Sequence, residues 1–452
     1  MFYRIFRACL GVCLRIFYRR IEAPGLEAVP GEGPLLLVAN HGSALMDPLL
    51  ILVMVPRAIS FLAKHTLFAM PVVGFVLRRI GGIPVYRRVD APSGESKNDA
   101  MFEACCGVLR SGGAVCLFPE GVSHDRPRLE PLRTGAARIF LRASGNSAAP
   151  VRIIPVGINF EQKKAFRSRV LILFGRPVET GGLDRPGEAG PGLGAEELTS
   201  RIERALGSLV PGLDSWEELQ FVREIERLYL GGRADSLAGE APVLKRFIEA
   251  YHLYRRSNPE AVLEIRRRWE AYRRQLARFS LTDSQVDLAE APARAARLLF
   301  AGAAATLLLL PLAGLGLLFH VVPYRLCGTI ERRINHHPDQ TATVKLMAGL
   351  ALFPATYVLL LAIPLARWGP RVVLPLLVFL AVTGWAALFV GENRQRLSES
   401  AGALLLAFPR SKALETIRRE RRGILDRVGD LIRQSSPFGP ADLSGGGGGP
   451  ER

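Results

Sequence analysis

The stretch Val38-Ala39-Asn40-His41-Gly42-Ser43-Ala44-Leu45-Met46-Asp47-Pro48 decides the fold of this chain. The apolar run Leu35–Ala39 ends abruptly in Asn-His, and a second apolar run opens after Asp47 and Pro48. This pattern predicts a buried strand, a polar turn and the start of a helix. His41 in such a turn, with Asp47 as an orienting partner, has the chemistry of a general base. A pair of this kind is more often structural when it stands alone, so the rest of the chain must decide.

Composition narrows the class of protein. The chain has 452 residues, of which 49% are hydrophobic and 22% charged, so polar and membrane regions are both expected. The net charge of +17 comes without zinc-finger spacing, an aromatic nucleotide platform or a polybasic tail. It therefore favours anionic lipid and acidic substrates over nucleic acid. The six cysteines and His336-His337 show no metal or redox spacing, which predicts no metal site and a reducing compartment.

Residues 22–180 alternate between strand-like and helical patterns. This alternation predicts an α/β domain with a mixed central sheet flanked by helices. The expected strands are 35–39, 59–63, 83–87, 114–118, 153–158 and 170–174. The expected helices are 48–55, 70–79, 99–110 and 134–143.

Residues 1–21 form a basic segment with no acidic residue. Its arginines fall at helical spacing in one stripe, which predicts an amphipathic helix lying in the headgroup layer of a membrane. A core-packing helix is the alternative. A signal peptide is excluded because charges interrupt every candidate apolar core. Farther along the chain, residues 181–194 are typical of a linker, and 195–290 of a charged helical region without chemistry.

The membrane region 298–390 contains three uncharged segments, 298–319, 346–366 and 372–390. Each is close to the roughly 20 residues that cross a bilayer. Three regions are basic: the residues that lead into the first segment (Arg294 and Arg297), the loop 320–345 and the tail 391–452. Basic regions tend to stay on the cytoplasmic side of a membrane, so this pattern favours a re-entrant first segment and one crossing hairpin over three crossings. The end of the tail is expected to be disordered. The arginine-rich composition indicates a GC-rich, bacterial genome. We therefore expect an integral protein of the bacterial inner membrane, and the basic loops place residues 22–180 on its cytoplasmic face.

The second polar site is Gly81-Gly82-Ile83-Pro84-Val85-Tyr86-Arg87-Arg88. Two arginines leave the end of a short strand there. A guanidinium at such a position can grip a phosphate with its planar fork. For Arg88, a merely solvated side chain is an equal alternative.

Two further sites also follow the strand pattern. Phe118-Pro119-Glu120-Gly121 places a glutamate at the carboxyl end of a probable central strand, where open α/β sheets bind ligands. Glu120 can accept a hydrogen bond from a substrate hydroxyl, and Gly121 lets backbone and substrate approach closely. The run Ile153–Gly157 is a strand whose Pro155 lines an apolar wall or simply packs in the core.

The four sites, in this order, resemble the motifs of the PlsC-like glycerolipid acyltransferases, which act on glycerol-3-phosphate or 1-acylglycerol-3-phosphate. The resemblance covers about residues 20–180, and the membrane region is similar to that of bacterial relatives of the yeast-type glycerol-3-phosphate acyltransferases. The matching motifs are His41 with Asp47, Gly81-x-Ile83-x-Val85-x-Arg87, Phe118-Pro119-Glu120-Gly121 and Ile154-Pro155-Val156.

One departure from the family pattern concerns the first motif. The family has four residues between His and Asp, and this chain has five, Gly42 to Met46. A bulge at Gly42-Ser43 would preserve the contact between the two side chains, and without one Asp47 would not be the partner. The longer spacing favours the glycerol-3-phosphate branch of the family.

The resemblance implies direct acyl transfer without metal or cofactor, from acyl-CoA or acyl carrier protein as donor substrate. His41 would be the general base and Asp47 its partner, while Glu120 would orient the glycerol hydroxyls. The phosphate of glycerol-3-phosphate, lysophosphatidate or dihydroxyacetone phosphate would be held by Arg87, with Arg88 and Lys64. Ser43 is expected to be a turn residue, because no Gly-x-Ser-x-Gly elbow surrounds it.

Two other classes of function compete with this interpretation. A non-catalytic lipid-binding scaffold would retain the fold, but intact His41, Asp47, Arg87 and Glu120 argue against it. A transporter built from the apolar segments would need intramembrane acids or bases, which the three predicted segments lack.

Overall fold

The computed structural model describes residues 1–86, 95–145, 147, 149–181, 193–231, 236–289, 292–335, 337–407 and 412–434. Predictions that concern Arg87, Arg88, His336, most of the linker and the end of the tail lie outside the described residues. The chain divides into two compact units. The sheet unit comprises Met1–Leu219, Ser236–Ala238 and Asn335–Leu346, and the other described residues form the helical unit.

The sheet unit contains a 7-stranded sheet in the order β1-β7-β6-β2-β5-β3-β4. All neighbouring strands are parallel except β6 and β7, so the predicted mixed sheet is confirmed. The edge strand β1 was not predicted, because three residues are too few to show a period. The strands are β1 (Arg20–Glu22), β2 (Leu35–Ala39), β3 (Ser60–Lys64), β4 (Ile83–Val85), β5 (Ala114–Leu117), β6 (Arg152–Phe160) and β7 (Arg169–Phe174).

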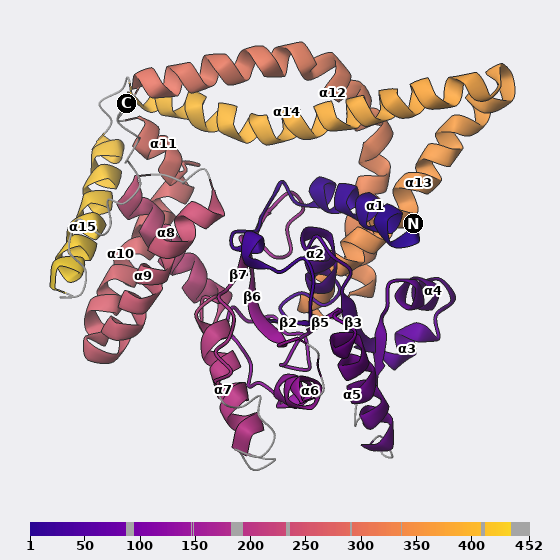
Figure 1. Ribbon diagram of the computed structural model, residues 1–452. Coiled ribbons are helices and arrows are strands. Elements are labelled where there is room, and N and C mark those ends of the chain that lie inside the picture. Colours follow the sequence, from indigo (N-terminus) through magenta and orange to yellow (C-terminus); the bar gives the residue numbers. More distant parts are fainter. Residues whose placement is uncertain are drawn as a thin grey trace, which may run out of the picture. The chain divides into compact units, whose positions relative to one another are not determined.

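Helices cover both faces of this sheet, with α1 and α2 on one side and α5, α6 and α7 on the other (Figure 1). All five residues of β2 are buried, and they alternate between the two resulting cores. A strand buried on both faces reads as a continuous apolar run, as Leu35–Ala39 does. The helices of this unit are α1 (Phe2–Phe17), α2 (Met46–Met54), α3 (His65–Phe68), α4 (Pro71–Arg79), α5 (Glu95–Arg110), α6 (Gly135–Ser144) and α7 (Leu193–Gly207), with the 3₁₀ turn η1 (Leu26–Ala28).

Helix α1 is amphipathic, and the side chain of Arg7 is fixed by a neighbouring helix. The Arg7 guanidinium turns inward and donates from Nε and Nη2 to the carbonyl of Val53 at 3.1 and 2.9 Å. The buried face of α1 packs on the sheet core, whereas Ile5, Val12 and Ile16 are about half exposed. The Val53 carbonyl near the end of α2 thus holds Arg7, and the position of α1 in a headgroup layer stays a prediction.

The helical unit is built from long helices. Three of them are long and apolar enough to cross a membrane, over Ala293–Ile334, Pro338–Trp368 and Pro370–Ala403, and they contain the three predicted segments. The helices that follow α7 in the chain are α8 (Trp216–Leu230), α9 (Leu237–Ser257), α10 (Pro259–Arg278), α11 (Asp283–Leu288), α12 (Pro292–Ile334), α13 (Thr341–Trp368), α14 (Val373–Ala407) and α15 (Lys412–Gln434), with the 3₁₀ turns η2 (Pro338–Gln340) and η3 (Pro370–Val372). Of these elements, η2 and the first residues of α13 belong to the sheet unit.

A histidine joins two of these apolar helices. His320 of α12 stands one residue beyond the predicted segment 298–319, yet within the span Ala293–Ile334. Its Nε2 lies 2.9 Å from the Tyr357 hydroxyl of α13, and its Nδ1 lies 2.7 Å from the carbonyl of Gly316. These contacts tie α12 to α13, and the three predicted segments themselves contain no acid or base.

A buried acid in α8 makes the helical unit sensitive to pH. Glu226 is 1% exposed and lies near Glu240. Burial, and then the charge of Glu240, raise the pKa of Glu226 to about 7. The folded state therefore holds this proton more tightly than the unfolded chain does.

We predict that the stability of the helical unit is lost progressively as the pH rises from about 4.5 through 7, by on the order of 3 kcal/mol from Glu226. Glu226→Gln keeps the side chain neutral and should abolish this part of the pH dependence. Thermal unfolding of the full chain at pH 5 and pH 8 measures the effect, with the exposed Glu217→Gln as matched control. An unchanged pH dependence in Glu226→Gln would refute the assignment.

Candidate active site

The sheet order brings the predicted sites to one edge. Strands β2, β5, β3 and β4 are neighbours and parallel, so their carboxyl ends lie together. His41 follows β2, Glu120 follows β5, Lys64 closes β3 and Tyr86 follows β4. Residues from distant stretches therefore meet at the edge where open α/β sheets bind ligands.

His41 and Asp47 form the predicted pair. The Nδ1 of His41 lies 3.0 Å from Oδ2 of Asp47, which also accepts the Ser43 backbone N–H at 2.6 Å. Asp47 is fully buried in the first turn of α2, where the helix dipole favours a negative charge. Because an ionised carboxylate only accepts hydrogen bonds, Nδ1 carries the proton and Nε2 keeps its lone pair. With the His41 side chain 16% exposed, that nitrogen can serve as a base.

The turn between His41 and Asp47 contains a strained position. Ala44 has a φ of +35°, in the left-handed region that favours glycine. With five residues between them, His41 and Asp47 still lie in contact, so the condition set for Asp47 as the partner is met.

Glu120 holds the turn that carries His41. It is 2% exposed, and its Oε1 accepts the backbone N–H of His41 at 2.6 Å. Its Oε2 accepts the backbone N–H of Glu130 at 2.8 Å and pairs with Nε2 of His124. The backbone N–H of His124 in turn donates to the carbonyl of His41 at 3.1 Å. Both Glu120 oxygens thus have protein partners, which supports a positioning role, and the contact with glycerol hydroxyls stays a prediction.

Two further contacts fix the His41 turn. The His41 ring stacks on Phe118, with ring centroids 4.2 Å apart and planes at 18°. The buried Asn40 amide donates to the Ile158 carbonyl at 3.1 Å and accepts the Ile158 N–H at 2.7 Å. The turn after β2 is therefore anchored to the strands on both sides of it, β5 and β6.

Arg133 is a site residue that the sequence pattern did not reveal. Its backbone N–H donates to the carbonyl of Pro119 at 2.8 Å, so it is fixed beside Glu120. Its exposed side chain lies over Gly121, where an added Cβ would stand 2.9 Å from Nε. Gly121 has a φ of +74° and leaves room for this guanidinium. Arg133 lies beside Gly121 because the chain folds back after Glu120. No residue spacing in the sequence predicts this position.

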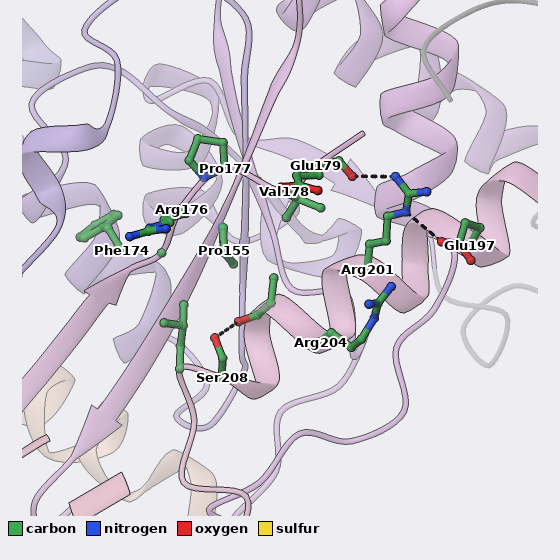
Figure 2. A pocket seen from close by; sticks show the side chains of 13 residues that line it. Pro155, Phe174, Arg176, Pro177, Val178, Glu179, Glu197, Arg201, Arg204 and Ser208 are labelled. Carbon is green, nitrogen blue, oxygen red and sulfur yellow. Dashed lines mark hydrogen bonds and ion pairs between the residues drawn. The ribbon is translucent and has the colours of Figure 1, made fainter. Parts of the chain in front are cut away.

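The pocket shown in Figure 2 is not this site. It has a volume of about 750 Å³ and is lined by Pro155, Arg176 and residues of α7, the helix that covers the opposite core from Phe118. Arg201 there already donates to Glu197 at 2.8 Å and to the Glu179 carbonyl at 3.0 Å. Within the described ranges, no three His, Cys, Asp or Glu side chains converge as a metal site would require.

Comparisons with known proteins place the same region in a family. Residues 20–159 match the acyltransferase family model. The chain is 22% identical to glycerol-3-phosphate O-acyltransferase 1 of Saccharomyces cerevisiae, over 92% of this chain and 69% of that protein. It is 28% identical to 1-acyl-sn-glycerol-3-phosphate acyltransferase of Borreliella burgdorferi, over 36% of this chain and 62% of that protein. The crystal structure of the 1-acyl-sn-glycerophosphate (LPA) acyltransferase PlsC from Thermotoga maritima matches with a TM-score of 0.34 and 18% identity, covering 45% of this chain and 79% of that one. The chain therefore carries a domain of the acyltransferase family.

We predict that Ala44→Gly preserves or raises stability, because glycine adopts a positive φ without a clash of its Cβ. Ala44→Val should lower the free energy of unfolding by about 1–2 kcal/mol and weaken the His41–Asp47 alignment. Thermal unfolding of the two variants tests this, with the exposed loop change Ala58→Val as control. Equal stability of Ala44→Val and wild type would show that Ala44 is not held in the left-handed conformation.

Proposed function

We propose that this protein is a membrane-bound O-acyltransferase of phospholipid synthesis. It would transfer a fatty acyl group from acyl-CoA or acyl carrier protein to glycerol-3-phosphate or lysophosphatidate. The observation that carries this proposal is the His41–Asp47 pair, with one imidazole nitrogen held by a buried carboxylate and the other open. A non-catalytic scaffold would have no need of that arrangement.

In the proposed reaction, Nε2 of His41 takes the proton of the acceptor hydroxyl as that oxygen attacks the thioester carbonyl. The new bond joins the acceptor oxygen to the acyl carbon, and the carbon–sulfur bond breaks. The departing thiolate receives the proton back from the imidazolium. Asp47 holds the imidazole tautomer and stabilises the imidazolium while it exists. The acceptor hydroxyl is itself the nucleophile, so no acyl-enzyme forms.

The cationic side chains at the sheet edge would bind the acceptor phosphate. Lys64 and Arg133 lie at this edge, and Arg87 and Arg88 follow in the chain directly after Tyr86. A guanidinium offers a phosphate two parallel N–H donors, which fixes the acceptor as well as attracting it. Fixing the acceptor beside His41 would supply much of the rate.

The lipid nature of the acyl chain gives the apolar parts of the protein a purpose. The three apolar helices would anchor the chain, and α1 would lie in the headgroup layer with its half-exposed face of Ile5, Val12 and Ile16. A bacterial inner membrane, with the active site on its cytoplasmic face, stays a prediction from composition and charge.

We predict that His41→Ala abolishes acyl transfer by the purified full chain while leaving its expression and membrane association intact. The assay offers labelled glycerol-3-phosphate and lysophosphatidate in parallel, each with acyl-CoA and with acyl carrier protein as donor. His65→Ala, a second histidine at the same edge, is the matched control and should retain activity. Turnover by His41→Ala would overturn the mechanism, and an inactive wild type with every pair would overturn the substrate assignment.

We predict that Arg133→Ala raises the KM for the phosphate-bearing acceptor by about tenfold or more, because it removes charge-assisted hydrogen bonds to phosphate. The KM for the acyl donor should change little, and Arg133→Lys should recover part of the loss. Arg138→Ala is the control, because the Arg138 guanidinium lies over the ring of Phe102, with its Cζ 4.5 Å from the ring centroid, and has no assigned role in phosphate binding. An unchanged acceptor KM in Arg133→Ala would remove Arg133 from the phosphate site.

A further inference from the structure

The segment Asn335–Leu346 links the apolar helices α12 and α13, yet it belongs to the sheet unit. Ala342 and Leu346 are 1% and 5% exposed and are part of the same core cluster as β2 and α2. Burial of these two side chains holds the segment against the sheet unit by the hydrophobic effect. The segment is therefore docked and not a loose connection.

This segment contacts the loop that holds His41. The carboxylate of Asp339, in η2, accepts a hydrogen bond from the Ser123 hydroxyl at 2.5 Å. Ser123 directly precedes His124, whose ring pairs with Glu120 and whose N–H donates to the His41 carbonyl. One hydrogen bond thus joins the segment to the residues that fix the catalytic turn.

A second contact joins the segment to the loop between β6 and β7. The Lys345 ammonium donates to the carbonyl of Lys164 at 2.8 Å. The neighbouring Lys163 is 5% exposed, and its ammonium donates to the carbonyl of His124 at 3.1 Å. The segment therefore contacts two loops, and both of them meet at His124.

We propose that Asp339 is a positioning residue for acyl transfer, acting through Ser123 on the loop that aligns His41. This inference rests on the proposed function of His41 as the general base. The Asp339 carboxylate accepts the hydrogen bond from Ser123 and so holds the loop from Phe118 to Asp125 in place. Because Glu120 lies in this loop, its carboxylate stays within hydrogen-bonding distance of the His41 backbone N–H. Loss of the acceptor lets the loop shift, so His41 is misaligned for attack while substrate binding persists.

The chemistry of the pair makes the proposal testable by conservative changes. Asp339→Asn keeps a side-chain oxygen that can accept the Ser123 proton, whereas Asp339→Ala has none. Ser123→Ala removes only the donor oxygen and leaves the segment and its buried apolar residues intact. Asp339 is partly exposed, so none of these changes opens a cavity in the core.

The experiment measures kcat and KM of the full chain for wild type, Asp339→Ala, Asp339→Asn, Ser123→Ala and the double variant with both alanines. We expect each alanine change to lower kcat about tenfold, with KM within twofold of wild type. The double variant should be no slower than either single one, because both remove the same hydrogen bond. Asp339→Asn should recover most of the rate, and the exposed neighbour Gln340→Ala should not change it.

Three outcomes would overturn the proposal: an unchanged kcat in Asp339→Ala, additive losses in the double variant, or a loss in KM alone. If Asp339→Ala fails to fold, Ser123→Ala and Asp339→Asn still decide it, since equal wild-type kcat in Ser123→Ala refutes the link. The proposed function fails separately, by an inactive wild type or an active His41→Ala, so the two failures are distinguishable.

Discussion

The carboxylate of Glu120 and the backbone N–H of His41 form the contact on which the rest of the site depends. A buried carboxylate is costly unless its oxygens are hydrogen-bonded, and Glu120 meets this demand with donors from His41, His124 and Glu130. These donors come from two separate stretches, so the carboxylate locks the turn after β2 to the loop after β5. The alignment of His41 is thus fixed by its backbone, and Asp47 has only to orient the ring.

Several arginine side chains in this protein donate hydrogen bonds to backbone carbonyls. The guanidinium of Arg7 satisfies a carbonyl near the end of α2, and that of Arg167 donates to the carbonyls of Arg15 and Ile16 at the end of α1. Arg57 likewise donates to the carbonyls of Pro30 and Gly112. The last carbonyls of a helix lack partners within it, and a cation near them is favourable. Part of the net charge of +17 therefore stabilises the fold, and not all of it is free to attract lipid or substrate.

The periodicity of apolar residues was sufficient to predict secondary structure where the local pattern and the tertiary structure agree. The bounds of β2 were predicted from its apolar run, and the parallel order then placed His41 and Glu120 at one edge. Contacts made when the chain folds back could not be predicted in this way. Arg133 reaches the site because its loop returns over Gly121, and Asp339 meets Ser123 from 216 residues away. The left-handed conformation of Ala44 was not predicted, since alanine gives no signal of a positive φ.

The segment Asn335–Leu346 belongs to the sheet unit, although it stands between the two long apolar helices α12 and α13. The chain therefore leaves the sheet unit, forms one apolar helix and is tied to that unit again before the next apolar helix begins. Arg421 of α15 pairs with Asp283 and Asp287 of α11, so the last described helix of the chain is tied to the helix that precedes α12. The apolar helices thus lie in two closed loops of chain, and each loop has both of its ends fixed by contacts with folded parts.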